Sequence, residues 1–212
     1  SFNCQIQTTE TTSNKIILSN ESCVILTSVF PKNTKIIKKL ANGKIWGAGE
    51  NLPVAIPHRY KKGKPGIDRL VNAYGALKMY SPPFLIIDYG TAITFDYLSR
   101  SRVFEGGLII PGPEISLQTL LARAALLPKQ MKLPSKTKGF LGRQTRDAMT
   151  AGVLEGYGAM TDGLVSRFKK RYGRNLRVIA TGGFAKTMKK FSSSLTIVDP
   201  YHTLKSLLRV FL

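Results

Sequence analysis

The chain has 212 residues, of which 43% are hydrophobic, and its mean hydropathy of −0.04 is typical of a folded globular protein. The composition excludes a disordered chain, and no apolar run approaches the ~20 residues that a membrane-spanning helix needs. A net charge of +20, from 32 basic and 12 acidic residues, favours anionic partners.

The basic residues are spread along the chain rather than gathered in a known nucleic-acid-binding motif. The sequence has no ribonucleoprotein-type aromatic signature, zinc-finger spacing or basic zipper. We therefore do not expect nucleic acid to be the main partner, and we expect no membrane association. The first residues form neither a signal peptide nor a transit peptide, so the cytoplasm is the expected location.

The first part of the chain contains short apolar or alternating runs. These runs predict strands over residues 2–8, 15–18 and 23–26, and a basic amphipathic helix over residues 34–40. The strands precede a turn-rich stretch, which leads to the next helix.

A Pro-Gly turn ending at Gly66 precedes a helix with a single apolar stripe. Asp68 and Arg69 lie in the first turn of this helix. The plainest interpretation is a carboxylate that is stabilised by the helix dipole, beside a surface arginine. A functional pair is the alternative, and the helix by itself does not decide between them.

The most informative stretch covers residues 84–96. Four apolar residues predict a buried strand, a carboxylate follows at Asp88, and Gly90-Thr91 can form a tight turn before an alternating second strand. Turn N–H groups and the Thr91 hydroxyl can hydrogen-bond phosphate oxygens, while Asp88 can hold a cation that offsets their charge. An ordinary hairpin, in which Asp88 and Gly90 serve only the turn, is the alternative interpretation.

The rest of the chain alternates strands and helices. In chain order we expect a strand over 104–112, a helix over 114–126, a long helix from Thr145, a strand over 177–180, a glycine turn over 181–183, a strand over 195–198 and a helix over 203–211. Thr145 can cap the long helix. Each glycine inside that helix costs about 1 kcal/mol relative to alanine, so we expect another helix or subunit to pack closely there.

This order of elements predicts an α/β protein of two lobes, each with a mixed sheet flanked by helices. The boundary is expected near residues 81–83. It divides the chain into an N-terminal lobe over residues 1–82 and a C-terminal lobe over residues 83–212. His58 and His202 are isolated in the sequence, so we expect surface or turn positions for them rather than metal ligation.

Taken together, these segments resemble the type III pantothenate kinases of the acetate kinase/sugar kinase/Hsp70/actin superfamily. The matching motifs lie, in the family's order, at residues 27–31, 66–73, 88–96, 106–112, 142–145, 180–183 and 198–204. The resemblance covers nearly the whole chain and implies two actin-like (ribonuclease H-like) lobes. It also implies ATP-dependent phosphorylation of pantothenate to 4′-phosphopantothenate, the first step of coenzyme A biosynthesis.

The resemblance further implies a role for each matching residue. Asp68 would be the general base, and Asp88 would bind a monovalent cation, K⁺ or NH₄⁺. Pantothenate would be held by Tyr60, Gly66, Ile67, Asp68, Arg69 and Thr145. ATP would be bound by Gly90, Thr91, Thr181, Gly182 and Gly183. Mg²⁺ would accompany ATP, and the protein would act as a homodimer.

One departure from the family pattern stands out. The family normally opens with a hairpin carrying Asp-x-Gly-Asn-Thr, the first phosphate loop, and this sequence has no counterpart of it. We expect a missing beginning rather than a loss of catalysis, because the other site residues remain. The alternative is a non-catalytic regulatory or nucleic-acid-binding protein on the same fold, which the net charge of +20 would suit.

Overall fold

The computed structural model describes residues 4–7, 15–19, 24–27 and 45–212, with side chains from Trp46 onward. The expected helix over residues 34–40 and most of the motif at 27–31 lie outside these ranges. Within them, no helix is both long enough and apolar enough to cross a lipid bilayer.

Four short strands form the first sheet, in chain order. They are β1 (Cys4–Gln7), β2 (Lys15–Ser19), β3 (Val24–Thr27) and β4 (Ile45–Gly47). β1 pairs antiparallel with β2, which pairs antiparallel with β3, whereas β4 pairs parallel with β3. A parallel pair cannot be joined by a tight turn, so the long connection between β3 and β4 follows from this topology.

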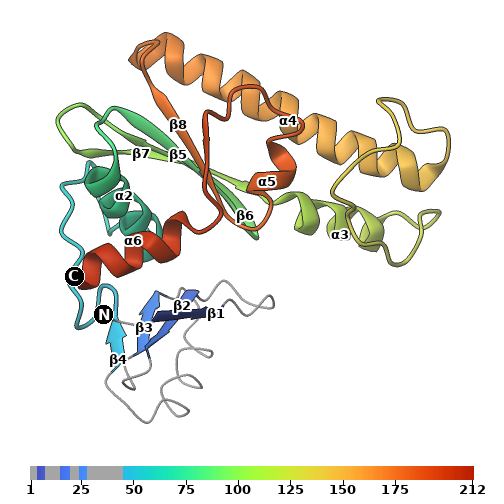
Figure 1. Cartoon of the computed structure of the whole chain (residues 1–212). Helices are drawn as coiled ribbons and strands as arrows, with labels where there is room; N and C mark the ends of the chain where they lie inside the picture. The colour runs from blue at the N-terminus through green and yellow to red at the C-terminus, as the bar shows by residue number, and fades with distance from the viewer. Residues whose placement is uncertain (1–3, 8–14, 20–23, 28–44) are drawn as a thin grey trace. The chain divides into compact units, whose positions relative to one another are not determined.

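The second sheet has five strands in the order β7-β6-β5-β8-β9. These strands are β5 (Phe84–Tyr89), β6 (Ala92–Leu98), β7 (Phe104–Pro111), β8 (Arg177–Thr181) and β9 (Ile197–Val198). β5 and β8 lie side by side in this sheet (Figure 1). Residues 84–87 of β5 are fully buried, as their continuous apolar run predicts.

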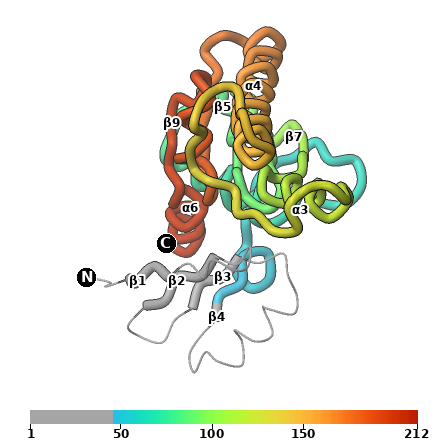
Figure 2. The backbone as a smooth tube through the Cα atoms, turned by 90° about the vertical axis from the view of Figure 1, so that its right-hand side faces the viewer, coloured from blue at the N-terminus to red at the C-terminus, as the bar shows by residue number. Residues whose placement is uncertain are grey.

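The helices follow the predicted order, with small differences at their ends. They are α2 (Ile67–Met79), α3 (Pro113–Arg123), α4 (Thr145–Tyr172), the short α5 (Ala185–Met188) and α6 (His202–Phe211). α3 ends before the expected residue 126, and the yellow connection in Figure 2 leads from it to α4. The prediction that Thr145 caps α4 is wrong by one position, because Gln144 is the N-cap residue and Thr145 already belongs to the helix.

Contacts divide the chain into two compact units, each built from segments that are distant in sequence. Unit 1 comprises Ser1–Phe84, Asp96–Gly107 and Tyr201–Leu212, and unit 2 comprises Leu85–Phe95 and Leu108–Pro200. The expected mixed α/β fold is confirmed, with parallel and hairpin-connected strands and flanking helices.

In unit 1, α6 packs against α2. Val71 of α2 and Leu204 and Leu207 of α6 form a buried cluster with residues of the β4–α2 connection. His202 opens α6 and is fully buried, with its Nε2 atom 3.0 Å from the carbonyl oxygen of Asn72. The prediction of a surface or turn position for His202 is therefore wrong, because the first residue of α6 already packs against α2.

In unit 2, the long helix α4 is tied to β5 by a buried hydrogen bond. The hydroxyl groups of Tyr89 and Thr161 lie 2.8 Å apart. Burial raises the pKa of Tyr89 to about 12, with the nearby charge of Asp162 adding to the rise and the Thr161 hydrogen bond opposing it. Tyr89 is therefore a neutral structural side chain that places the end of β5 against α4.

Candidate active site

The start of α2 presents Asp68, the expected general base. Its Oδ1 atom accepts the backbone N–H of Arg69 at 2.9 Å, and its side chain is partly exposed. Gly66 is the N-cap residue, and a Cβ atom there would lie 2.7 Å from Asp68 Oδ1. The small residue at Gly66 therefore leaves room for the carboxylate in this orientation. Ile67 lies beside them, with its side chain packed against Gly49 and the α2–α6 core.

Arg69 is not the surface residue of the plain sequence interpretation, because it is only 6% exposed. Its Nε and Nη2 atoms donate to Asp96 Oδ1 on β6 at 2.9 and 2.5 Å. Its Nη1 atom donates to the Tyr60 hydroxyl at 2.9 Å. The guanidinium group also lies over the ring of Phe104, 5.4 Å from its centroid. Four segments of unit 1 therefore meet at one side chain.

Asp96 stabilises the charged form of the Arg69 guanidinium group. Burial alone would lower the pKa of Arg69, but the hydrogen bond and the charge of Asp96 raise that pKa above its usual value. A buried guanidinium is tolerated when a carboxylate balances it in good geometry. The two side chains thus form a permanently charged, internally neutralised pair.

The β5–β6 turn carries the expected phosphate-binding residues. β5 ends at Tyr89, Gly90 and Thr91 form the connection, and β6 begins at Ala92. Gly90 and Thr91 are both exposed, and the Gly90 N–H donates to the Ala92 carbonyl at 3.1 Å. This turn leaves the Thr91 side chain at the surface, where a phosphate oxygen can reach it.

Two glycines from other segments pack against this turn. The Gly112 N–H donates to the Thr91 carbonyl at 2.8 Å, and a Cβ atom at Gly112 would overlap the carbonyl oxygens of the turn. Gly182 has a φ of +91°, and a Cβ atom there would overlap the carboxylate of Asp88. Only glycine fits both demands at position 182, since L side chains avoid positive φ.

The glycine turn after β8 therefore lies next to Asp88. The three residues differ in access, however. Thr181 is fully buried, and its hydroxyl donates to the Pro200 carbonyl at 3.4 Å, whereas Gly183 is exposed. A nucleotide can reach the backbone at Gly183 more readily than the side chain of Thr181.

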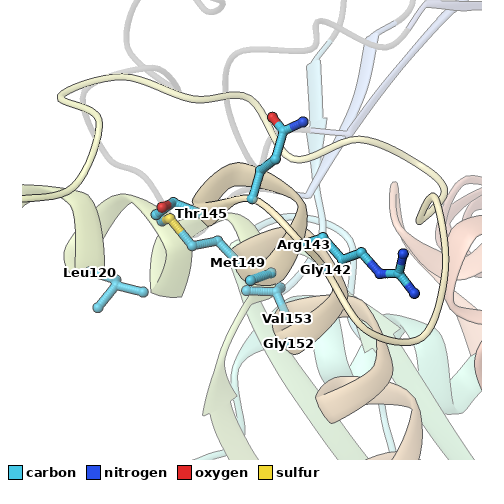
Figure 3. A pocket seen from close by; sticks show the side chains of 9 residues that line it. Leu120, Gly142, Arg143, Thr145, Met149, Gly152 and Val153 are labelled. Atoms are coloured by element: carbon cyan, nitrogen blue, oxygen red, sulfur yellow. The ribbon is translucent and has the colours of Figure 1, made fainter.

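Thr145 lines a groove of about 770 Å³ at the start of α4. Figure 3 shows Leu120 of α3 on one side of this groove and Thr145 and Met149 of α4 on the other. Arg143, just before α4, also lines this groove. Thr145 is exposed and open to a ligand.

Among the described side chains, no group of three His, Cys, Asp or Glu residues could hold a metal ion. Asp88 is partly exposed, and its carboxylate and the Tyr89 carbonyl both lie against Gly182. Mg²⁺ commonly takes few protein carboxylates when phosphates supply its other ligands.

Sequence reasoning missed Asp96 and Phe104 as parts of this site. Asp96 stands at the end of the recognised hairpin motif, on the polar side of the predicted strand alternation. The structure buries both sides of β6 from Phe95 to Leu98, so this carboxylate lies inside. A charged residue within an otherwise apolar strand was the available signal, because a buried carboxylate needs a partner.

Comparisons with known proteins identify the family of this chain. Residues 4–167 match the family model of the type III pantothenate kinases. The chain is 38% identical over 194 residues to a type III pantothenate kinase of Caulobacter vibrioides, covering 89% of this chain and 74% of that protein. It is 41% identical over 147 residues to one of Bacillus cytotoxicus, covering 69% of this chain and 55% of that protein.

The fold also has a counterpart among solved structures. A Campylobacter jejuni protein, assigned to the Baf family of transcriptional activators, matches with a TM-score of 0.60 and 18% identity. The match covers 94% of this chain and 93% of that one, and at this identity it speaks for the fold alone. The family model and the two sequence relatives carry the assignment, and the chain belongs to the type III pantothenate kinase family.

Proposed function

We propose that this chain transfers a phosphoryl group from ATP to pantothenate and forms 4′-phosphopantothenate, the first step of coenzyme A biosynthesis. The observation that carries the proposal, beside family membership, is the start of α2 in unit 1. There the partly exposed Asp68 precedes the buried Arg69, whose guanidinium group donates to Asp96 and to the Tyr60 hydroxyl. These residues offer a base, Asp68, and a hydrogen-bond donor, the Tyr60 O–H, to a polar substrate.

In this proposal Asp68 accepts the proton of the pantothenate hydroxyl as the phosphoryl group arrives. The transition state of phosphoryl transfer is loose, so orienting the hydroxyl matters more than a strong base. An aspartate with an ordinary pKa near ~3.9 suffices if it takes the proton late. In unit 1, Gly66 leaves room for the Asp68 carboxylate, and Gly66 and Ile67 would contact pantothenate beside it. In unit 2, Thr145 lines the groove at the start of α4 and would also bind pantothenate.

ATP would be bound by unit 2. The Thr91 hydroxyl and backbone N–H would donate to phosphate oxygens, with Gly90 shaping the turn beneath them. The backbone at Thr181, Gly182 and Gly183 would lie beside the nucleotide. Asp88 would hold K⁺ or NH₄⁺, whose charge offsets that of the phosphates, and Mg²⁺ would arrive with ATP. The exposed turn and the close packing of Gly182 on Asp88 support these roles.

The finer organisation is also proposed. Cytoplasmic location would suit an enzyme that uses ATP. We further propose an N-terminal lobe over residues 1–82 and a C-terminal lobe over residues 83–212, each with an actin-like fold. A homodimer would use the outer face of α4, where Gly152, Gly156 and Gly163 are exposed with open space around each. Exposed glycines allow another backbone to approach closely.

Calorimetric titration with pantothenate, and then with ATP, Mg²⁺ and K⁺, tests the function directly. We expect the chain to bind pantothenate and Thr145→Ala to weaken that binding. If the folded wild-type chain binds no pantothenate, the proposed substrate is wrong.

The assignment of Asp68 is tested by Asp68→Asn, which keeps the size of the side chain but removes the base. We expect turnover to fall by about 10²-fold or more with little change in thermal stability, because a positioned general base contributes that much. Asp147→Asn is the matched control, since Asp147 also occupies the first turn of a helix but pairs with the exposed Lys138. Near-normal turnover in Asp68→Asn would refute the assignment.

A further inference from the structure

We propose that Asp96 is a positioning residue for pantothenate, which fixes Arg69 and, through Arg69, orients the hydroxyl of Tyr60 as a donor to an acceptor oxygen of the substrate. The inference rests on the proposed function for the identity of the ligand. Asp96 itself is fully buried and cannot touch a ligand, so any effect on binding must pass through its partners.

The first step in the argument is the geometry at Asp96. One carboxylate oxygen, Oδ1, receives both Arg69 Nε at 2.9 Å and Arg69 Nη2 at 2.5 Å. Arg69 lies in the first turn of α2 and Asp96 lies in β6, so this contact joins a helix to a strand within unit 1. Two bonds from different nitrogens fix the plane of the guanidinium group, which a single contact would leave free to rotate.

The ring of Phe104 fixes the same group from another direction. The Arg69 guanidinium carbon lies 5.4 Å from the ring centroid, and the Tyr60 and Phe104 rings meet edge to face at 6.1 Å. The Arg69 side chain is therefore held in its plane by Asp96 and covered by an aromatic face. Its Nη1 atom is left pointing at the Tyr60 hydroxyl, 2.9 Å away.

The direction of that last hydrogen bond decides what Tyr60 can do. A guanidinium group can only donate, so the Tyr60 oxygen must accept. The phenolic proton then points away from Arg69, and no described residue takes it in a hydrogen bond. Tyr60 is partly exposed, so its O–H can donate to a carbonyl or carboxylate oxygen of a bound ligand. Arg69 thus sets the direction of the Tyr60 O–H, and Asp96 holds Arg69 in the position where it does so.

The pairing also determines the charge that a substrate meets. Arg69 and Asp96 cancel one another, so the cluster offers neutral donors rather than a free cation at this point. Tyr60 therefore recognises an acceptor oxygen of the ligand by a hydrogen bond. That bond depends more on the position of the oxygen than on its charge.

The test is pantothenate titration of Tyr60→Phe, Asp96→Asn and the double variant. Each single change is expected to raise the Kd for pantothenate about 10-fold, because each removes or misdirects one hydrogen bond to a polar ligand. The Kd of the double variant is expected to be no more than about 2-fold above that of the weaker-binding single variant. The two substitutions are not independent, because both affect the same hydrogen-bonded chain through Arg69. Glu105→Gln is the matched control, because the Glu105 carboxylate pairs with the exposed Arg59 at 3.5 Å. The Kd of this variant for pantothenate should equal that of the wild type.

A second readout separates positioning from general stability. In the wild-type protein the Arg69 Nε–H is expected to give a distinct NMR signal in slow exchange with solvent. Tyr60→Phe should keep that signal while weakening pantothenate binding, and Asp96→Asn should lose it. If Asp96→Asn does not fold, Tyr60→Phe and the wild-type Nε–H signal still decide the question, with Arg69→Lys as the variant that keeps the charge but breaks the fork.

Wild-type affinity in Tyr60→Phe, multiplied losses in the double variant, or a rapidly exchanging Arg69 Nε–H would each overturn the proposal. Failure of the proposed function is recognised differently. In that case the wild-type chain binds no pantothenate, while the Arg69 signal still reports whether Asp96 holds the guanidinium group.

Discussion

At the scale of single residues, Asp162 of α4 is an acceptor for three consecutive serines. Its carboxylate receives the hydroxyls of Ser192 and Ser193 at 2.5 and 3.1 Å, and the backbone N–H groups of Ser193 and Ser194 at 3.2 and 3.0 Å. Burial alone would raise the pKa of Asp162, but these hydrogen bonds lower it to about 2. The carboxylate therefore closes the loop after α5 onto α4.

Because folding depresses this pKa, the ionised form stabilises the folded state above the unfolded pKa, and that contribution is lost as the pH falls through the folded value. We expect Asp162→Ala to lower the free energy of unfolding by about 1–2 kcal/mol at pH 7, allowing for solvent screening. The difference from wild type should shrink progressively below about pH 5, because the unfolded carboxylate protonates first. Urea unfolding at pH 7 and pH 3 measures it, and a pH-independent difference would contradict the role of the charge.

At the scale of elements, Gly75 of α2 lies in close contact with Ser206 of α6 in unit 1. A Cβ atom at Gly75 would overlap both the side chain and the backbone of Ser206. Ser206 is fully buried, and its hydroxyl finds no hydrogen-bond partner among the described residues. At this pair, the two helices are therefore in close contact, and the buried Ser206 hydroxyl makes no hydrogen bond to a described residue.

We expect Ser206→Ala to raise the free energy of unfolding by up to about 1 kcal/mol, because it removes a buried hydroxyl that is not hydrogen-bonded. Gly75→Ala should lower it by about 1–3 kcal/mol through overpacking. Thermal unfolding of the two variants gives the signs. A destabilised Ser206→Ala variant would mean that the hydroxyl has a partner in the folded protein.

The glycines of α4 divide into two kinds. Gly158 is buried, and a Cβ atom there would overlap the carbonyl group of Phe191, which is the close backbone approach that the sequence predicts. Gly156, by contrast, is exposed with nothing within 4 Å of its Cβ position, like Gly152 and Gly163. These exposed positions cost helix stability, and nothing in the described part of the chain lies within 4 Å of a Cβ atom placed there.

Alanine substitution separates the two kinds. Gly158→Ala should destabilise the fold by about 1–3 kcal/mol, whereas Gly156→Ala should stabilise the isolated chain by about 1 kcal/mol through helix propensity. If the exposed face of α4 is a subunit contact, Gly156→Ala should also shift the protein from dimer towards monomer. Light scattering over a dilution series measures this shift, and an unchanged dimer would exclude a close contact at that glycine.

At the scale of the whole molecule, the net charge of +20 raises the question of a polyanionic partner. Residues 163–198 alone contain nine basic residues and no acidic one. Such a stretch attracts phosphate groups, whether they belong to ATP or to nucleic acid. Charge by itself does not choose between an enzyme with a basic surface and a regulatory protein.

Salt dependence makes the choice. We expect pantothenate affinity to change only a few-fold between about 50 and 200 mM salt, because the ligand carries one charge and is read mainly by hydrogen bonds. Binding to duplex DNA through several phosphate contacts should fall by about 10³-fold or more over the same range. Fluorescence anisotropy with labelled DNA provides the comparison. Tight DNA binding that persists at 200 mM salt would favour the regulatory alternative.

Much of the fold and family was predictable from the sequence because the relevant signals are local. The buried run of β5, the Gly90-Thr91 turn and the Pro-Gly start of α2 each depend on a few adjacent residues, whose conformational preferences are strong. Asp68 and Asp88 could be singled out for the same reason. Asp68 comes shortly after the Pro-Gly turn, and Asp88 lies between the apolar run of β5 and the Gly90-Thr91 turn. Helix ends were less predictable, as α3 and α4 show, because neighbouring residues compete for the cap position.

By itself, the sequence determined the order of elements, the family and the candidate residues. The tertiary structure alone decided which of those residues are held by others. The Arg69–Asp96 pair and the packing of α6 on α2 join segments that are far apart in the chain. Such contacts leave no periodic pattern in the sequence, because they depend on which surfaces meet when the segments fold together. For that reason Arg69, which the sequence allowed to be a surface residue, is a buried cation whose partner only the fold reveals.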